Sequence, residues 1–165
     1  MDPSPQIEIS AGKLRGRRDR GLDVFCGIPF AAPPVGAQRF KPPAPPRAWA
    51  GVRDATMPAA ICPQAPSRLR FAMGDAEADQ NEDCLTVTVW TPGADGARRP
   101  VVVWLHGGAY VSGGGAVDWY SGARLAREGN IVVVGVNYRL GALGYLCHPD
   151  LSLGNLGLLD QQAAV

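Results

Sequence analysis

Apolar residues gather in three short runs in the second half of the chain. Residues 84–91 alternate threonine with branched or bulky apolar residues, a pattern typical of a β-strand. Residues 101–105 and 131–138 are apolar almost throughout, as expected for strands whose two faces are both covered. The pattern therefore predicts three strands at these positions.

Helices are predicted between and after these strands. Residues 121–128 are predicted to form a short helix that ends at Gly129. Asn155 stands near the cap of a second predicted helix, which begins at residue 156. The order of strand, glycine-rich loop, helix, strand and helix favours an α/β fold with a mostly parallel sheet.

The first half of the chain favours strands that lead into this α/β unit. Residues 7–16 and 22–30 are predicted as two strands joined by a turn around residues 19–21. We expect them to add an antiparallel edge to the sheet. Prolines in the segment 33–46 exclude regular structure, so this segment is expected to run over the surface or to line a cleft.

Composition and charge narrow the class of protein. The chain has 165 residues, 46% of them hydrophobic and 19% charged, which indicates one globular domain. The net charge of +1 gives no electrostatic reason to expect nucleic acid or an acidic membrane surface as a partner.

The longest apolar runs have the length of a strand, so no membrane span is predicted. The first ten residues lack the features of a signal peptide, which predicts a cytoplasmic protein, whereas an upstream leader would make it a secreted one.

The cysteines give no sign of a metal or cofactor site. No two of the four are spaced as C-x-x-C, which argues against a zinc or redox motif. We therefore expect no metal and no cofactor, and the plainest interpretation is four buried thiols. The four are Cys26, Cys62, Cys84 and Cys147.

The candidate chemistry lies in the glycine-rich segment 106–115, which directly follows the predicted strand 101–105. A strand that runs into such a loop leaves backbone N–H groups free, and these can hold the negative oxygen of an acyl-transfer transition state. The sequence resembles the HGGG-type oxyanion loop of lipases and esterases. A structural glycine turn without chemistry is the alternative. A Rossmann phosphate loop fits poorly, because the glycines do not follow G-x-G-x-x-G and no acidic residue ends the next strand.

A serine nucleophile at the expected position is missing. None of the serines has glycine two residues before and two residues after it, as a G-x-S-x-G elbow requires. The two histidines are His106, inside the glycine loop, and His148, which we expect in a solvated loop. A Ser-His-acid triad therefore cannot be assembled at the usual places.

Several short motifs in order give the chain a resemblance to a known family. The chain resembles the N-terminal third of the type-B carboxylesterases, the family of cholinesterases and bacterial p-nitrobenzyl-type esterases. The most specific element is Glu-Asp-Cys-Leu at residues 82–85. The other matching segments are residues 27–31, 33–36, 39–40, 104–110, 137–139 and 154–161.

The resemblance implies an α/β-hydrolase fold, of which residues 1–165 would be an N-terminal fragment of a mostly parallel sheet with antiparallel leading strands. It implies hydrolysis of small-molecule carboxylic esters by a serine nucleophile, with the N–H groups of Gly108 and Ala109 as oxyanion donors. The chain would end before the nucleophile elbow and would lack the catalytic serine, acid and histidine. It would therefore be inactive alone and would need the missing C-terminal portion of the domain as its partner. The alternative is a non-catalytic cholinesterase-like interaction module or a pseudogene-type fragment.

The resemblance also implies structural roles. Cys62 and Cys84 match a pair that is bridged in secreted members. Arg39 and Glu82 match a buried ion pair that fixes the proline-rich segment. Arg139 matches an arginine whose acidic partner would lie beyond the end of this chain.

Four other residues receive weaker assignments. Asp160 is expected to be a helix-cap or core hydrogen-bonding residue and not a catalytic acid. His106 is expected to fix the glycine loop. Trp119 and Tyr120 follow that loop. Either they line the acyl pocket or they pack in the core.

Overall fold

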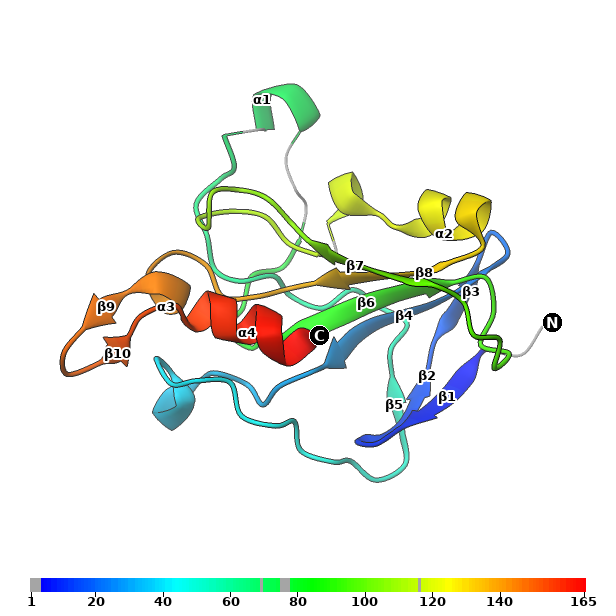
Figure 1. Cartoon of the computed structure of the whole chain (residues 1–165), viewed down its shortest axis with the longest axis horizontal. Coiled ribbons are helices and arrows are strands. Elements are labelled where there is room, and N and C mark those ends of the chain that lie inside the picture. Colours follow the sequence, from blue (N-terminus) through cyan, green and yellow to red (C-terminus); the bar gives the residue numbers. More distant parts are fainter. Residues whose placement is uncertain (1–3, 69, 75–77, 116) are drawn as a thin grey trace.

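A mixed β-sheet forms the centre of the molecule (Figure 1). The structure is a computed structural model that describes residues 4–68, 70–74, 78–115 and 117–165. Within these residues the sheet has five strands. In spatial order they are β3 (Arg17–Asp19), β4 (Leu22–Pro29), β6 (Thr86–Thr91), β8 (Val132–Val136) and β7 (Val101–Leu105).

The sheet changes from antiparallel to parallel along this order. The pairs β3–β4, β4–β6 and β6–β8 are antiparallel, which confirms the predicted antiparallel leading strands. The pair β7–β8 is parallel, with Val101 opposite Val132 and Leu105 opposite Val136. The bounds of β7 agree with the predicted strand 101–105.

The N-terminal segment forms hairpins. The turn between β3 and β4 consists of Arg20 and Gly21, both with positive φ, as a two-residue hairpin turn requires. The prediction of one strand over residues 7–16 is wrong. Two strands, β1 (Gln6–Ile9) and β2 (Gly12–Arg15), pair there as an antiparallel hairpin, and β5 (Val52–Asp54) adds to β2 in parallel.

A helix lies on each side of the large sheet (Figure 1). Helix α2 (Ala123–Gly129) contacts β4, β6 and β8 on one side. On the other side, α4 (Leu156–Ala164) packs against α3 (Gly141–Tyr145). The remaining helix, α1 (Arg70–Met73), is a single turn. None of the helices in the described ranges has the length and apolarity that a membrane span requires.

Asparagine ends or begins two helices through its backbone conformation. The predicted stop at Gly129 is displaced by one residue, because Gly129 still belongs to α2 and Asn130 adopts the left-handed conformation after it. Asn155 precedes α4 as predicted, but its φ is 55° and its side chain makes no capping hydrogen bond. Asparagine tolerates this region of φ/ψ space better than most residues, which explains both positions.

The remaining elements are short. Strands β9 (Cys147–His148) and β10 (Ser152–Leu153) form a small hairpin, so His148 is exposed on a strand and not in a loop. The proline-rich segment holds only one 3₁₀ turn, η1 (Gly36–Gln38). A second 3₁₀ turn, η2 (Asp118–Tyr120), precedes α2.

Strand β7 is the unusual element of the sheet. The sequence predicts a strand covered on both faces, but its five residues are between 37% and 58% exposed. Strand β8 pairs with one edge of β7, and no other strand of the described residues pairs with the opposite edge. This apolar edge can therefore pair with the same edge of another copy.

We predict that the 165-residue chain self-associates through β7. Val103→Lys should lower the association, because a lysine on an edge strand opposes pairing with a second copy. Met57→Lys is the control, because Met57 is 74% exposed but lies outside the strands. Sedimentation velocity would measure the mass distribution, and equal distributions for the two variants would contradict the prediction.

Candidate functional site

The glycine-rich segment 106–115 forms a compact loop after β7. The N–H groups of Val111 and Ser112 both donate to the Gly108 carbonyl oxygen, at 3.1 and 3.2 Å, and close a turn. Inside the turn, Ala109 and Tyr110 have φ values of 53° and 63°. Left-handed conformations at two successive non-glycine residues are costly, so the loop needs contacts that hold it in this form.

Close backbone approaches explain two of the glycines. A Cβ atom on Gly108 would lie 1.8 Å from the carbonyl oxygen of Ser112. A Cβ atom on Gly115 would lie 2.5 Å from the backbone nitrogen of Val136 in β8. A side chain at Gly108 would open the turn of the loop, and a side chain at Gly115 would push the loop away from the sheet.

His106 fixes the beginning of the loop. Its Nδ1 atom lies 2.8 Å from the carbonyl oxygen of Gly107, and its ring stacks on Tyr138 with 4.3 Å between the ring centroids. The Tyr138 hydroxyl donates to the His106 carbonyl oxygen at 2.5 Å. Burial lowers the pKa of His106, so its imidazole is neutral near pH 7. The geometry agrees with a loop-fixing role.

Asn137 fixes the end of the loop. Its Oδ1 atom accepts a hydrogen bond from the Gly115 N–H at 2.7 Å. Its Nδ2 atom donates to the carbonyl oxygen of Ala60 and to Thr86 Oγ1, both at 3.3 Å. Sequence reasoning gave no role to Asn137 or Tyr138. The available signal was two polar residues directly after a buried apolar strand.

Several N–H groups of the loop remain available. Among the described residues, the N–H groups of Gly107, Gly108, Ala109 and Tyr110 donate to no acceptor, and Gly108 and Ala109 are the two expected oxyanion donors. These groups border an open recess of about 250 Å³ that is lined by residues 106–110 and Tyr138. Backbone donors in such a recess can bind an oxygen that carries negative charge.

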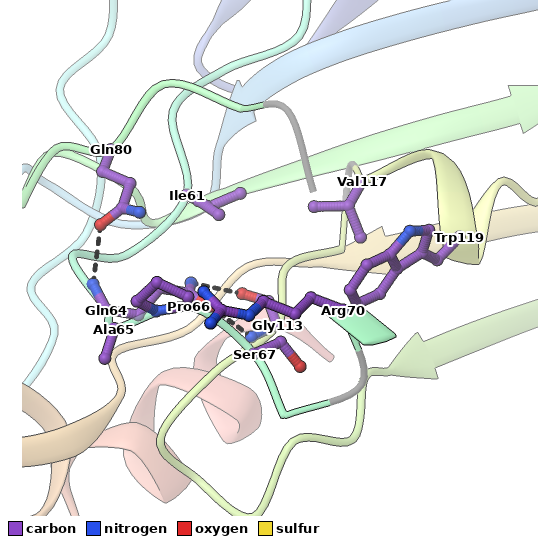
Figure 2. A pocket seen from close by; sticks show the side chains of 10 residues that line it. All are labelled: Ile61, Gln64, Ala65, Pro66, Ser67, Arg70, Gln80, Gly113, Val117 and Trp119. Atoms are coloured by element: carbon purple, nitrogen blue, oxygen red, sulfur yellow. Dashed lines mark hydrogen bonds between the residues drawn. The ribbon is translucent and has the colours of Figure 1, made fainter. Parts of the chain in front are cut away.

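A second cavity is lined in part by Gly113 of the loop (Figure 2). It has a volume of about 140 Å³. Gly113, Val117 and Trp119 line it from the loop side, and residues between 61 and 70, together with Gln80, line it from the opposite side. Trp119 lines this cavity, and Trp119 and Tyr120 both line a further open cavity. The Tyr120 ring also packs against Trp104 and His106.

Arg139 has its acidic partner within this chain, so the expectation that the partner lies beyond residue 165 is wrong. The guanidinium donates to both carboxylate oxygens of Asp160, at 2.7 and 2.6 Å, and to the carbonyl oxygen of Lys41. The side chains of Arg139 and Asp160 are 3% and 0% exposed. The packing of α4 against α3 carries Asp160 back to Arg139. Asp160 is therefore a core hydrogen-bonding residue, as expected.

Arg39 and Glu82 form an ion pair that is less buried than expected. The Arg39 guanidinium donates to both Glu82 carboxylate oxygens, and the Nε–Oε2 distance is 2.6 Å. The Arg39 side chain is 50% exposed and that of Glu82 is 20% exposed. Solvent reaches the guanidinium because the proline-rich segment runs over the surface, so the pair contributes less than a buried pair would.

The thiols of Cys62 and Cys84 lie in contact inside the core. Both are free and buried, and they belong to the same cluster of core residues. The neighbouring Cys62 side chain and burial raise the pKa of the Cys84 thiol. Cys26 is also a buried free thiol, whereas Cys147 is exposed, contrary to the expectation of four buried thiols. In the described part of the chain, no three His, Cys, Asp or Glu residues are placed to hold a metal ion.

We predict that the two ion pairs differ in their contribution to stability. Asp160→Asn should lower the free energy of unfolding by about 3–5 kcal/mol, because it leaves the Arg139 charge buried without a partner. Glu82→Gln should lower it by about 1 kcal/mol or less, because the Arg39 guanidinium keeps access to water. Urea denaturation followed by fluorescence would measure both, and equal losses would contradict the difference in burial.

We also predict that oxidation joins Cys62 to Cys84. The two thiols are already in contact, and the disulfide would close a loop of about 22 residues, which stabilises a fold by roughly 3 kcal/mol in the chain-entropy model. Peptide mapping without reduction would identify the bond, with Cys26 as the buried control that stays reduced. Four thiols that still react with an alkylating agent after oxidation and unfolding would show that the bond does not form.

Comparison with known proteins identifies the family of this chain. The model of the carboxylesterase family matches residues 3–165. The para-nitrobenzyl esterase of Bacillus subtilis is 44% identical over 162 residues, which cover 96% of this chain and 33% of that protein. The fumonisin B1 esterase of Sphingopyxis macrogoltabida is 44% identical over 171 residues, which cover 99% of this chain and 31% of that protein. The chain thus spans about a third of the length of the curated relatives that it matches.

Solved structures agree with the sequence comparison. A carboxylesterase of Geobacillus stearothermophilus superposes with a TM-score of 0.86 and 43% sequence identity, over 96% of this chain and 32% of that one. The sheet described above, with antiparallel strands leading into the parallel pair β7–β8, is therefore part of an α/β-hydrolase fold. The resemblance that the motifs carried is confirmed, and the chain belongs to the carboxylesterase family.

Proposed function

We propose that this chain supplies the oxyanion loop of a serine carboxylesterase. In this proposal, the N–H groups of Gly108 and Ala109 donate to the carbonyl oxygen of a carboxylic ester as that oxygen becomes negative. The observation that supports it is that the N–H groups of Gly108 and Ala109 have no acceptor among the described residues and border an open recess, while the loop is held by hydrogen bonds at Gly113 and Gly115. Family membership supports ester hydrolysis as the reaction.

The chemistry of acyl transfer explains why such a loop matters. Attack on the carbonyl carbon moves an electron pair to the carbonyl oxygen, and fixed donors bind this charge more strongly than they bind the neutral ester. The loss of one such donor lowers kcat by roughly 10²–10³-fold. A loop that is already held in place needs no reorganisation during the reaction.

The nucleophile belongs to another part of the proposed enzyme. No serine of this chain lies in a G-x-S-x-G elbow, and Asp160, an acid, is bound to Arg139. We therefore propose that residues 1–165 form the N-terminal part of a single domain. The serine, the acid and the histidine come from the remaining portion, which is the partner of this chain.

The isolated chain should show no esterase turnover. An oxyanion hole without its triad retained roughly 10³–10⁴-fold acceleration over water in proteases with a complete binding site, and less is expected of this chain. Hydrolysis of p-nitrophenyl acetate and labelling by a fluorophosphonate probe would measure this. Saturable hydrolysis together with a labelled serine would contradict the proposal.

Fragment complementation tests the role of the loop. The chain would be co-expressed with the part of the Bacillus subtilis para-nitrobenzyl esterase that lies outside the matched third. The proposal expects turnover of p-nitrophenyl acetate that Gly108→Ala abolishes, because the new Cβ would displace the loop. Gly96→Ala is the control, because Gly96 also has positive φ but has open space around it. Equal turnover for both variants would contradict the assignment.

A non-catalytic interaction module remains the alternative, favoured by the absence of an elbow serine in the sequence. It predicts stable association with the complementary fragment or with another protein, and no turnover in any combination. The free donors of the glycine loop favour the esterase, because a binding module does not need them.

A further inference from the structure

The side-chain amide of Gln64 binds the glycine loop from the opposite wall of the second cavity (Figure 2). Its Oε1 atom accepts from the Gly113 N–H at 2.5 Å, and its Nε2 atom donates to the Gly113 carbonyl oxygen at 2.7 Å. The second hydrogen on Nε2 goes to the Cys62 carbonyl oxygen at 2.9 Å. Both amide hydrogens and the amide oxygen are therefore in use, and only one orientation of the amide satisfies all three bonds.

Gly113 in turn contacts the first two residues of the loop. Gly113 has a φ of 115°, and a Cβ atom there would lie 2.4 Å from His106 Nδ1 and 2.6 Å from the Gly107 carbonyl oxygen. Gly113 is thus pressed against the two residues that precede Gly108. A shift of Gly113 away from Gln64 would remove the support on which His106 and Gly107 rest.

We propose that Gln64 is a positioning residue for the oxyanion donors. By holding both backbone groups of Gly113, Gln64 fixes Gly113 against His106 and Gly107 and so sets where the N–H groups of Gly108 and Ala109 point. The structural part of this inference stands on the hydrogen bonds alone. The catalytic part rests on the proposed function, because it requires that these donors bind the oxyanion.

The two hydrogen bonds between the Gln64 side chain and the backbone of Gly113, here called the clamp, require an amide and exclude a carboxylate. Gly113 offers a donor and an acceptor side by side, so its partner must carry an acceptor and a donor in the same spacing. A carboxylate accepts but cannot donate, and its second oxygen would face the carbonyl oxygens of Gly113 and Cys62. A protonated carboxylic acid carries one donor and one acceptor and reproduces the pair of bonds to Gly113.

Gln64→Glu therefore turns the clamp into a pH-dependent one. Hydrogen bonding favours the neutral acid in the folded chain, so the pKa of the introduced glutamate should lie above its unfolded value of about 4.3. The loop should be held below the folded pKa and released as the pH rises through it. Arg70 lines the same cavity in every variant, and any titration of His106 is shared with the unmodified chain.

Gln80→Glu is the matched control. The Oε1 atom of Gln80 accepts from the backbone N–H of Gln64 at 2.8 Å, and a carboxylate oxygen can accept the same bond. The amide-to-acid change is therefore identical in the two variants, but only Gln64 needs its donor to hold Gly113. Gln64→Ala, which removes the clamp without adding a charge, separates release of the loop from the effect of a buried carboxylate.

The test is the amide NMR spectrum of residues 107–115 between about pH 5 and about pH 8, around the range where a raised glutamate pKa is expected. The inference expects Gln64→Glu to match the unmodified chain at low pH and to depart from it at high pH. Gln64→Ala should be displaced at every pH, and Gln80→Glu should match the unmodified chain throughout. Loop signals of Gln64→Ala that coincide with those of the unmodified chain would overturn the inference.

The complemented esterase gives the second measurement. Gln64→Glu should lower kcat relative to the unmodified assembly by roughly 10²-fold at high pH, with little change in KM, and recover at low pH, because misplacement by about 1 Å is enough for such a loss. An unchanged kcat with displaced loop signals would overturn the catalytic part only. An assembly that is inactive with the unmodified chain would count against the proposed function and leave the NMR result on Gln64 standing.

Discussion

The structure depends on the three polar side chains that follow β8, each of which is buried and binds a different segment of the chain. Asn137 holds Gly115, Tyr138 holds His106, and Arg139 holds Asp160 in α4. The apolar strand before them is fixed in the sheet, so these side chains project from a rigid base. Leaving one of these buried side chains without its hydrogen bonds would cost roughly 1–3 kcal/mol for a neutral group and more for the charge of Arg139. The segments that carry Gly115, His106 and Asp160 are therefore held against these side chains.

The glycine loop illustrates why such support is needed. A segment with few side chains has little apolar surface to bury, and glycine loses more conformational freedom on folding than other residues. Ala109 and Tyr110 add the cost of left-handed conformations. Hydrogen bonds from Gln64 and Asn137 and the stacked His106 ring offset these costs. The N–H groups of Gly108 and Ala109 are then left free as a consequence of how the rest of the loop is bound.

Sequence patterns predict the parts of this fold that depend on local chemistry. The bounds of β7 follow from an apolar run, and the β3–β4 turn follows from its glycine. The split of residues 7–16 into β1 and β2 was missed because alternation continues through the turn. The contacts of Gln64 with Gly113 and of Arg139 with Asp160 join residues 49 and 21 positions apart, which periodicity cannot detect. The position of the glycine loop could therefore be predicted, but the side chains that shape it could not.

The rates of amide hydrogen exchange in the unmodified chain test the account most directly. If the loop is held in place before any substrate arrives, the N–H groups of Gly113 and Gly115 exchange slowly, because Gln64 and Asn137 accept their hydrogen bonds. The N–H groups of Gly108 and Ala109, a few residues away, should exchange much faster. Equal, fast exchange at all four positions would show that the loop is not held by these side chains and would contradict the account.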